Sequence, residues 1–258
     1  MYLPVPPQPD CSTAWLAAVK LVDAHAGHEA HNVIIDIANP VAATTRQNPV
    51  VKTVDHFLEG QDKSVACVAN TIFPEALYHR HGAPEFFDAF RDTVLPKVRR
   101  SQRWSGYYFE RMMHLPTRSG QSINQLWDIV GRIRDDHNRS RNKFELSLFD
   151  PERDVDGSPY GGQCLSFLSF KLLPGSEKRL ALTALYRNHY YIEKLLGNLI
   201  GLGRLMAFVA KEGGVNLGPL TVVSTHAKID HPGATKRTDI EGLLGACIQA
   251  SANLRVAE

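Results

Sequence analysis

The residue best suited to covalent chemistry in this sequence is Cys164. It follows the glycine-containing segment 156–162 and opens an apolar run, so we expect it where a loop meets a strand, at the edge of a cavity. A thiol acts as a nucleophile when nearby positive charge stabilises its thiolate. Without such neighbours, a cysteine is more often a small buried apolar residue. The residues that accompany Cys164 in the fold therefore decide between a nucleophile and a core thiol.

Polar side chains downstream of Cys164 could provide this environment. Arg187 ends an apolar run, where its guanidinium could hold a phosphate through two hydrogen bonds and lower the pKa of a thiol. Asn198 is the one amide in the apolar segment 191–211. Because an unpaired buried amide costs on the order of 1–3 kcal/mol, Asn198 needs a backbone or ligand partner. His226 and Lys228 are two positions apart in a predicted strand and therefore share one face.

The first half of the chain predicts mainly helices. Apolar residues at helical spacing indicate helices over 14–25, 84–98 and 123–133, and 32–37 is a β-branched strand. Ser12 or Thr13 is expected to cap the first of these helices, and Ser122 the third.

The second half of the chain predicts a sheet, with strands at 143–149, 163–172, 180–186 and 220–229. A long apolar helix over 191–211 separates the last two strands and ends at Gly213-Gly214. The glycines at 197, 201 and 203 lie inside this helix, so we expect them to pack it closely on the sheet. The predicted fold is α+β, a mostly antiparallel sheet backed by a long buried helix, in a single domain over 1–258.

Composition limits the class of protein. The chain has 258 residues, 43% of them hydrophobic and 22% charged, and a net charge of +2, so it predicts a soluble globule with no nucleic-acid or membrane partner. No signal peptide is recognised, and the most apolar run, 195–210, is too short to span a bilayer. The four cysteines form no CxxC pair, which favours a reducing, cytoplasmic location and no bound metal.

The order of these residues resembles the thymidylate synthase family, part of the superfamily that includes pyrimidine nucleotide hydroxymethyltransferases. The resemblance covers about 140–230. It rests on Cys164, a following strand, Leu185-Tyr186-Arg187, the eleven-residue step from Arg187 to Asn198, and Thr225-His226-Ala227-Lys228, which matches the family's T-H-x-Y strand. Upstream, Arg139-Ser140-Arg141 resembles the family's S-R-R element.

The resemblance implies a thymidylate synthase-like enzyme. In the family, the cysteine thiolate adds to C6 of a uridylate or cytidylate ring, and C5 then takes a one-carbon unit from methylenetetrahydrofolate, giving methylation or hydroxymethylation. By this resemblance Cys164 would be the nucleophile, Arg187 would hold the phosphate, and Asn198 would bind the pyrimidine edge. His226 would contact the ribose or take part in proton transfer, as a second catalytic candidate.

The resemblance also implies a homodimer that packs sheet against sheet. In such a dimer Arg141, with Arg139, would reach the phosphate in the partner's site. Asn188, which follows Arg187, and Lys228 are further candidate substrate contacts.

The sequence departs from the family mainly on the folate side. Gln163 and Leu165 flank the cysteine in place of the family's P-C-H, and Asn188 replaces the serine of its R-S pair. Tyr190 stands where the family has a folate-binding aspartate and is the candidate cofactor contact, while Lys228 replaces a sugar-contacting tyrosine.

Asparagine at 198 favours a uridylate, with cytidylate as the second choice. Lys228 suggests a changed sugar or phosphate contact, such as a ribonucleotide. Two alternatives remain open at this point: a catalytically silent nucleotide-binding or regulatory protein with the same fold, and a core thiol whose neighbours in sequence match by chance.

Overall fold

The computed structural model describes residues 2–98, 106–117, 120–135, 137–138, 140–155 and 162–257. Within these residues a mixed sheet of seven strands has the order β1-β2-β9-β7-β6-β5, with β8 beside β9. Its strands are β1 (Leu3–Pro4), β2 (Glu29–Ile37), β5 (Phe144–Ser147), β6 (Leu165–Leu173), β7 (Arg179–Tyr186), β8 (His189–Tyr190) and β9 (Asn216–Lys228). The long neighbours pair antiparallel, except that β7 and β9 run parallel.

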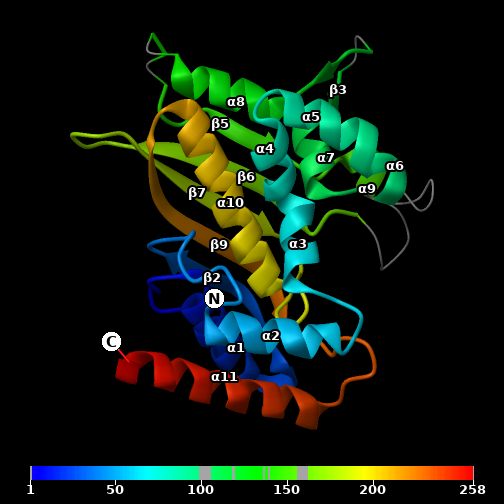
Figure 1. The fold of residues 1–258 in the computed structure, drawn as a ribbon, viewed down its shortest axis with the longest axis vertical. Coiled ribbons are helices and arrows are strands. Elements are labelled where there is room, and N and C mark those ends of the chain that lie inside the picture. The colour runs from blue at the N-terminus through cyan, green and yellow to red at the C-terminus, as the bar shows by residue number, and fades with distance from the viewer. Residues whose placement is uncertain are drawn as a thin grey trace.

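The helix α10 (Leu195–Gly213) connects β7 and β8 to β9 and crosses one face of the sheet (Figure 1). The other helices are α1 (Cys11–Asp23), α2 (Pro49–Glu59), α3 (Val65–Ile72), α4 (Glu75–His81), α5 (Glu85–Ala89), α6 (Leu95–Val98), α7 (Tyr108–Met113), α8 (Gln125–Arg134), α9 (Pro151–Asp154) and α11 (Arg237–Ala257). In Figure 1, α1, α2 and α11 gather around β2 at the end where both termini lie. A separate pair of short strands, β3 (Leu115–Pro116) and β4 (Ser122–Ile123), lies outside this sheet.

Successive side chains along each strand point to opposite faces of the sheet, and the two faces differ in their burial. The face under α10 carries buried rows, one of which is Leu168, Ala184, Val222 and Ile35. The opposite face carries a row of half-buried apolar residues, Phe167, Leu185, Val223 and Ile34. The predicted α+β class, with a mostly antiparallel sheet and a buried helix, is confirmed.

The glycines of α10 pack against different neighbours from those predicted. A side chain at Gly197 would meet Val68 and the backbone of Val65, both in α3. A side chain at Gly203 would lie 2.9 Å from the carbonyl carbon of Pro40 and closer still to its oxygen. The glycines therefore allow α10 to approach α3 and the Pro40 loop, and the expectation that they serve contact with the sheet was wrong.

Two helix starts also differ from the prediction. Asp10, rather than Ser12 or Thr13, caps α1, because its carboxylate accepts a hydrogen bond from the Thr13 backbone N–H at 2.9 Å. The Asn124 side chain caps α8 by accepting from the Trp127 N–H at 3.0 Å. The residues expected to open this helix, 122–123, instead form β4.

The segment 84–98 is helical as predicted, but it contains a π-helical turn, Phe90–Val94, between α5 and α6. The helix α10 ends where the sequence predicts, with Gly214 in the left-handed conformation (φ 68°). Across the described residues, no helix combines the length and apolar character needed to cross a membrane.

Candidate functional site

One end of the sheet brings the candidate residues together. Because β6 begins where β7 ends, the Leu165–Tyr186–Ser224 register places Cys164 beside Arg187, and Arg187 beside β9. The Arg187 N–H donates to the Cys164 carbonyl at 2.9 Å, and the Thr225 hydroxyl donates to the Arg187 carbonyl at 2.9 Å. Residues far apart in sequence are thus fixed next to one another by backbone pairing.

A cavity of about 310 Å³ opens at this end of the sheet. Four of the predicted site residues line it: Cys164, Asn188, Tyr190 and Asn198. Val68 and Thr71 from α3, residues 106–108, Gly162, Gln163, His189 and Lys194 complete the lining. This volume is at the lower end of the range typical of small-molecule pockets.

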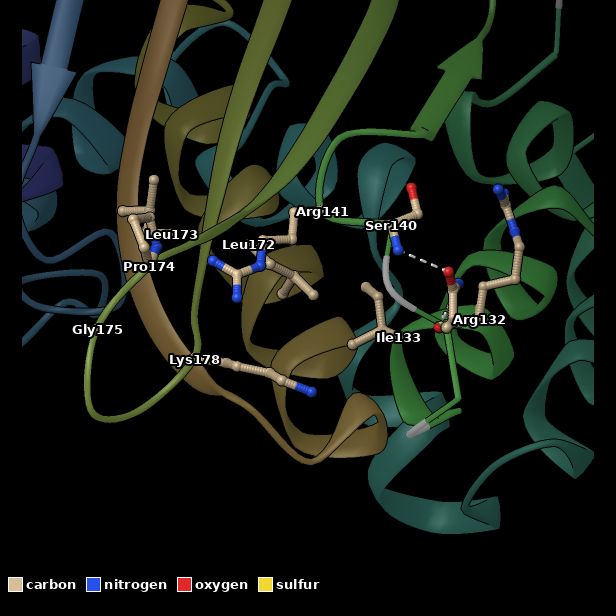
Figure 2. A pocket seen from close by; sticks show the side chains of 10 residues that line it. Arg132, Ile133, Ser140, Arg141, Leu172, Leu173, Pro174, Gly175 and Lys178 are labelled. Carbon is tan, nitrogen blue, oxygen red and sulfur yellow. Dashed lines mark hydrogen bonds between the residues drawn. The ribbon is translucent and has the colours of Figure 1, made fainter.

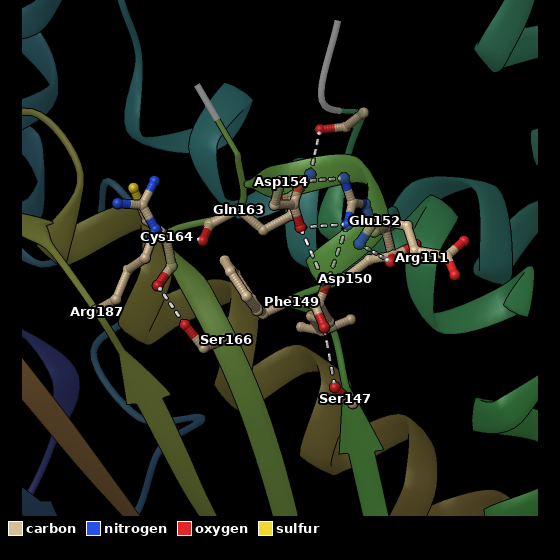
Figure 3. A network of polar contacts seen from close by, with 12 residues as sticks. Arg111, Ser147, Phe149, Asp150, Glu152, Asp154, Gln163, Cys164, Ser166 and Arg187 are labelled. Atoms are coloured by element: carbon tan, nitrogen blue, oxygen red, sulfur yellow. Dashed lines mark hydrogen bonds and ion pairs between the residues drawn. The ribbon is translucent and has the colours of Figure 1, made fainter. Parts of the chain in front are cut away.

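Cys164 is half-buried at the cavity wall. Burial raises the pKa of its thiol above the ordinary value, while the positive charges of Arg187 and Lys194 act in the opposite direction. Figure 3 shows the Arg187 guanidinium beside the sulfur, with its Nε donating to the Gln163 carbonyl at 3.0 Å. Because the pKa is raised overall, the thiol is mainly protonated at neutral pH, and the two cations stabilise its minor thiolate form.

The Asn198 carboxamide is buried at the same cavity, with 3% of the residue exposed. Its Nδ2 lies 2.8 Å from Nε2 of His189, which is also buried. Its Oδ1 is buried and has no hydrogen-bond partner among the described residues. The predicted need of Asn198 for a partner is therefore met on the nitrogen side, while the oxygen remains available to a bound donor.

His226 and Lys228 lie outside the lining of the cavity. Nδ1 of His226 is 2.7 Å from Oδ1 of Asn188, an atom that only accepts, so His226 donates this hydrogen bond. Glu29 faces both residues from β2, with its carboxylate 3.5 Å from Nε2 of His226 and 3.9 Å from Nζ of Lys228. The shared face predicted for these two residues is confirmed, and Asn188 connects His226 to the cavity.

Arg141 lies at the opposite end of β6, where its carbonyl accepts a hydrogen bond from the Leu172 N–H at 3.0 Å. It lines a second pocket of about 320 Å³ with Arg132 and Lys178 (Figure 2). Within one chain the structure does not bring Arg141 to Cys164, so its role in a partner's site stays a prediction. Arg139 and residues 156–161 lie outside the described residues.

Three side chains at the site were missed by the sequence analysis: Tyr108, His189 and Lys194. The hydroxyl of Tyr108 lies against the backbone of Cys164 and Leu165, and burial raises its pKa. The basic character of Lys194, four residues before Asn198, was a usable signal. Nothing in the sequence distinguishes Tyr108 or His189 from other aromatic residues, because only the fold shows what they contact.

The fit to a folate is incomplete. Tyr190 is 38% exposed and could stack on a flat ring. A pterin, however, presents a donor edge that a carboxylate would pair with, and none of the described residues lining the cavity is acidic. The described lining therefore does not fit a folate. The described residues also contain no cluster of three or more His, Cys, Asp or Glu side chains placed to hold a metal ion.

No known family model matches the chain, and no curated protein matches it. The cavity combines a thiol, the cation Lys194 and a carboxamide whose oxygen has no partner among the described residues. Arg187 lies outside the lining, and its positive charge, like that of Lys194, acts on the thiol from nearby. This combination suits a planar heterocycle with a donor on its edge and an anionic substituent.

Proposed function

We propose that this cavity binds a pyrimidine nucleotide, uridylate in preference to cytidylate, and that the Cys164 thiolate adds to C6 of the ring. The observation that carries this proposal is the presence of the thiol and the unpaired Asn198 oxygen in the lining of one cavity. In the proposed complex, Asn198 pairs with the base edge, and Arg187 and Lys194 lie on the side of the phosphate. The protein is then a thymidylate synthase-like methyltransferase or hydroxymethyltransferase.

The proposed addition balances as follows. The sulfur–C6 bond forms as the C5–C6 π electrons move toward C5 and O4, and the thiol proton leaves to solvent. The resulting enolate carries charge on O4, where an amide N–H can stabilise it. C5 becomes a carbon nucleophile, which exchanges its hydrogen and can accept a one-carbon unit. Transfer from methylenetetrahydrofolate is an expectation of the family resemblance, and Tyr190 is the residue that would contact it.

A homodimer is also part of the proposal. The half-buried row Phe167, Leu185, Val223 and Ile34 gives the sheet an apolar face opposite α10. Sheet-to-sheet packing of two copies would cover this row and allow Arg141 to reach the partner's site. The four cysteines are all free, which suits the reducing environment of the cytoplasm, the location we propose.

A second candidate is a catalytically silent nucleotide-binding or regulatory protein. It is favoured by the raised pKa of Cys164, since a mainly protonated thiol is a poor nucleophile. Both candidates need the same ligand, so they differ only in whether the ring is attacked.

Release of tritium from C5 separates the two candidates. Purified protein would be incubated with 5-tritiated dUMP, UMP, dCMP or CMP, with and without methylenetetrahydrofolate, beside Cys164→Ala and the matched control Cys67→Ala. Cys67 is an exposed free cysteine and does not line this cavity. We expect release with a uridylate, lost in Cys164→Ala and kept in Cys67→Ala.

The same nucleotides would be tested for thermal stabilisation of the protein. A nucleotide-dependent shift without tritium release would favour the silent binding protein. Neither shift nor release with any of the four nucleotides would refute both candidates.

A further inference from the structure

A turn at residues 191–194 joins β8 to α10 at the wall of the cavity. It directly follows Tyr190 and ends with Lys194, and both of these residues line the cavity. Lys194 precedes the first residue of α10, and its side chain makes no capping hydrogen bond to the helix. Because backbone N–H groups at the start of a helix have no partner within it, those of this turn must be held by groups from elsewhere in the chain.

Asp230 holds the middle of this turn from the segment that follows β9. Its Oδ1 accepts a hydrogen bond from the Ile192 N–H at 2.8 Å, and its Oδ2 accepts from the Glu193 N–H at 3.3 Å. Hydrogen bonds to a carboxylate are roughly twice as strong as those between neutral groups. One carboxylate therefore satisfies two consecutive backbone donors that precede α10.

Two neutral hydrogen bonds hold the first residue of the turn. The indole N–H of Trp15, in α1, donates to the Tyr191 carbonyl at 2.9 Å, and the Tyr191 N–H donates to the Lys228 carbonyl at 2.9 Å. Trp15 is fully buried, so its indole has a fixed position. Together, Trp15, Lys228 and Asp230 contact the backbone of three successive residues of the turn.

The side chain of Lys194 is held as well. Its Nζ lies 2.5 Å from one carboxylate oxygen of Glu193, and the other oxygen lies 2.8 Å from Nζ of Lys63. Burial alone would raise the pKa of Glu193, but the hydrogen bonds and charges of the two lysines lower it overall, so Glu193 is ionised at neutral pH. The Lys194 ammonium is thereby kept at the wall of the cavity that contains the Cys164 thiol.

We propose that Asp230 is a positioning residue for Cys164: by fixing the turn 191–194, its carboxylate keeps the Lys194 ammonium close enough to the thiol to stabilise the thiolate. The positive charge of Lys194, with that of Arg187, favours the ionised thiol. This attraction weakens as the distance between the charges grows, so it depends on the position of the turn. The inference rests on the proposed function for its consequence, because addition to C6 requires a thiolate. The effect on the thiol itself can be measured without a nucleotide.

The sign of the effect separates positioning from a simple effect of charge. Removing a negative charge near a thiol favours the thiolate. If Asp230 acted only through its charge, Asp230→Ala would move the ionisation of Cys164 to lower pH. If Asp230 holds Lys194 in place, the same substitution releases the ammonium, and the ionisation moves to higher pH. A purely structural role would lower the stability of the protein and leave the ionisation of the thiol unchanged.

The ionisation would be measured as the pH dependence of the rate at which iodoacetamide alkylates Cys164, in a Cys67→Ala background. Cys67 is exposed and the two remaining cysteines are buried, so the reaction in this background reports Cys164. Tyr108 and Tyr186 also interact with the thiol, but burial raises their pKa values, and they stay neutral over the range of the measurement, pH 6 to 10.5. The quantity compared is the midpoint, the pH at which the rate is half of its maximum. A change in access to the thiol alters the maximal rate and not the midpoint.

We expect Lys194→Gln to move the midpoint to higher pH and to lower the rate constant at pH 7.5 roughly two- to tenfold. Asp230→Ala should do the same, and the double variant should show little further change, because both substitutions act through one ammonium. Asp230→Asn removes the charge but keeps an acceptor oxygen for the turn, so its midpoint should stay close to that of the wild type. Trp15→Phe removes one neutral hydrogen bond from the turn and no charge, and it should move the midpoint to higher pH by less than Asp230→Ala.

An Asp230→Ala midpoint that is unchanged or at lower pH would refute the positioning role. A midpoint unaffected by Lys194→Gln would also contradict it, as would a Cys164 that does not react at any pH. If Asp230→Ala does not fold, Trp15→Phe decides, and an unchanged midpoint there counts against the proposal. These outcomes leave the proposed function to the tritium-release assay. Absence of tritium release beside the expected midpoints would instead refute the proposed function and leave the role of Asp230 intact.

Discussion

Substitution of Gly203 by alanine tests how closely α10 must approach the rest of the fold. The added methyl group would lie 2.9 Å from the carbonyl carbon of Pro40 and closer to its oxygen. Ordinary contacts between carbon atoms are 3.5–4.0 Å. Because the obstacle is backbone, no side-chain rotation relieves the overlap, and either α10 or the Pro40 loop must move. Cys11 also donates to this carbonyl, at 3.2 Å, so movement of the loop disturbs α1 as well.

Two opposing effects set the magnitude. Replacing glycine by alanine within a helix stabilises by about 1 kcal/mol through backbone entropy. Overpacking costs typically 1–3 kcal/mol, and an overlap with backbone belongs at the upper end of that range. We therefore expect Gly203→Ala to lower the free energy of unfolding by about 2 kcal/mol. For a chain of this size this corresponds to a fall in Tm of roughly 4–8 °C.

Gly242 provides the matched control, because it lies inside α11, is exposed, and has no atom within 4 Å of an added methyl group. Gly242→Ala should gain the same helix preference without the overlap and raise stability by about 0.5–1 kcal/mol. Urea unfolding followed by circular dichroism would compare both variants with the wild type. If Gly203→Ala is as stable as Gly242→Ala, the packing argument is wrong.

The remaining predictions concern charges. Arg111 pairs with both carboxylate oxygens of Asp154, at 2.6 and 2.7 Å, and the two side chains are 5% and 0% exposed (Figure 3). Asp154→Ala leaves the Arg111 cation buried and should lower the free energy of unfolding by roughly 3–5 kcal/mol. Removing the exposed Arg91–Asp88 pair by Asp88→Ala should lower the free energy of unfolding far less in the same assay, because solvent screens this pair. Equal losses from the two substitutions would contradict this reasoning. The pKa of His189 is lowered to about 3, against an ordinary value of 6.5, so the unfolded chain binds a proton that the folded chain does not, and stability falls as pH drops below 6.5. In the wild type we expect the free energy of unfolding to fall by up to about 1.4 kcal/mol per pH unit between pH 6.5 and 4.5, and His189→Phe to lack this fall. The same pH dependence in both proteins would show that His189 is not the group responsible.

The sequence predicted the sheet better than it predicted the site. Runs of β-branched and aromatic residues marked β2, β6, β7 and β9, and the run of apolar residues marked α10, because periodicity is a local property. Asn198 could also be singled out locally, since a lone amide among apolar residues requires a partner. Its partner, His189, was missed because the contact depends on how the turn after β7 folds back onto α10.

Helix caps and packing partners were predicted less well, because they depend on the three-dimensional arrangement of the chain more than on the local sequence. Asp10 and Ser12 both suit the start of α1, and only the geometry selects Asp10 as the cap. The glycines of α10 indicated close packing without indicating against what, because α3 was not predicted at all. Its residues, Val65–Ile72, span only 8 positions, fewer than the window over which helical periodicity is recognised in a sequence.

The pairing of β2 with β9 has a consequence for how the chain is made. Glu29 pairs with Lys228, and β2 has no other long neighbour among the described strands. During synthesis, which proceeds from the N-terminus, β2 must wait until most of the chain has left the ribosome before it can pair. Contacts of such long sequence separation slow folding. Cys164 is therefore synthesised well before the strand that completes its surroundings, and during that interval the nascent thiol is open to any oxidant or chaperone that reaches it.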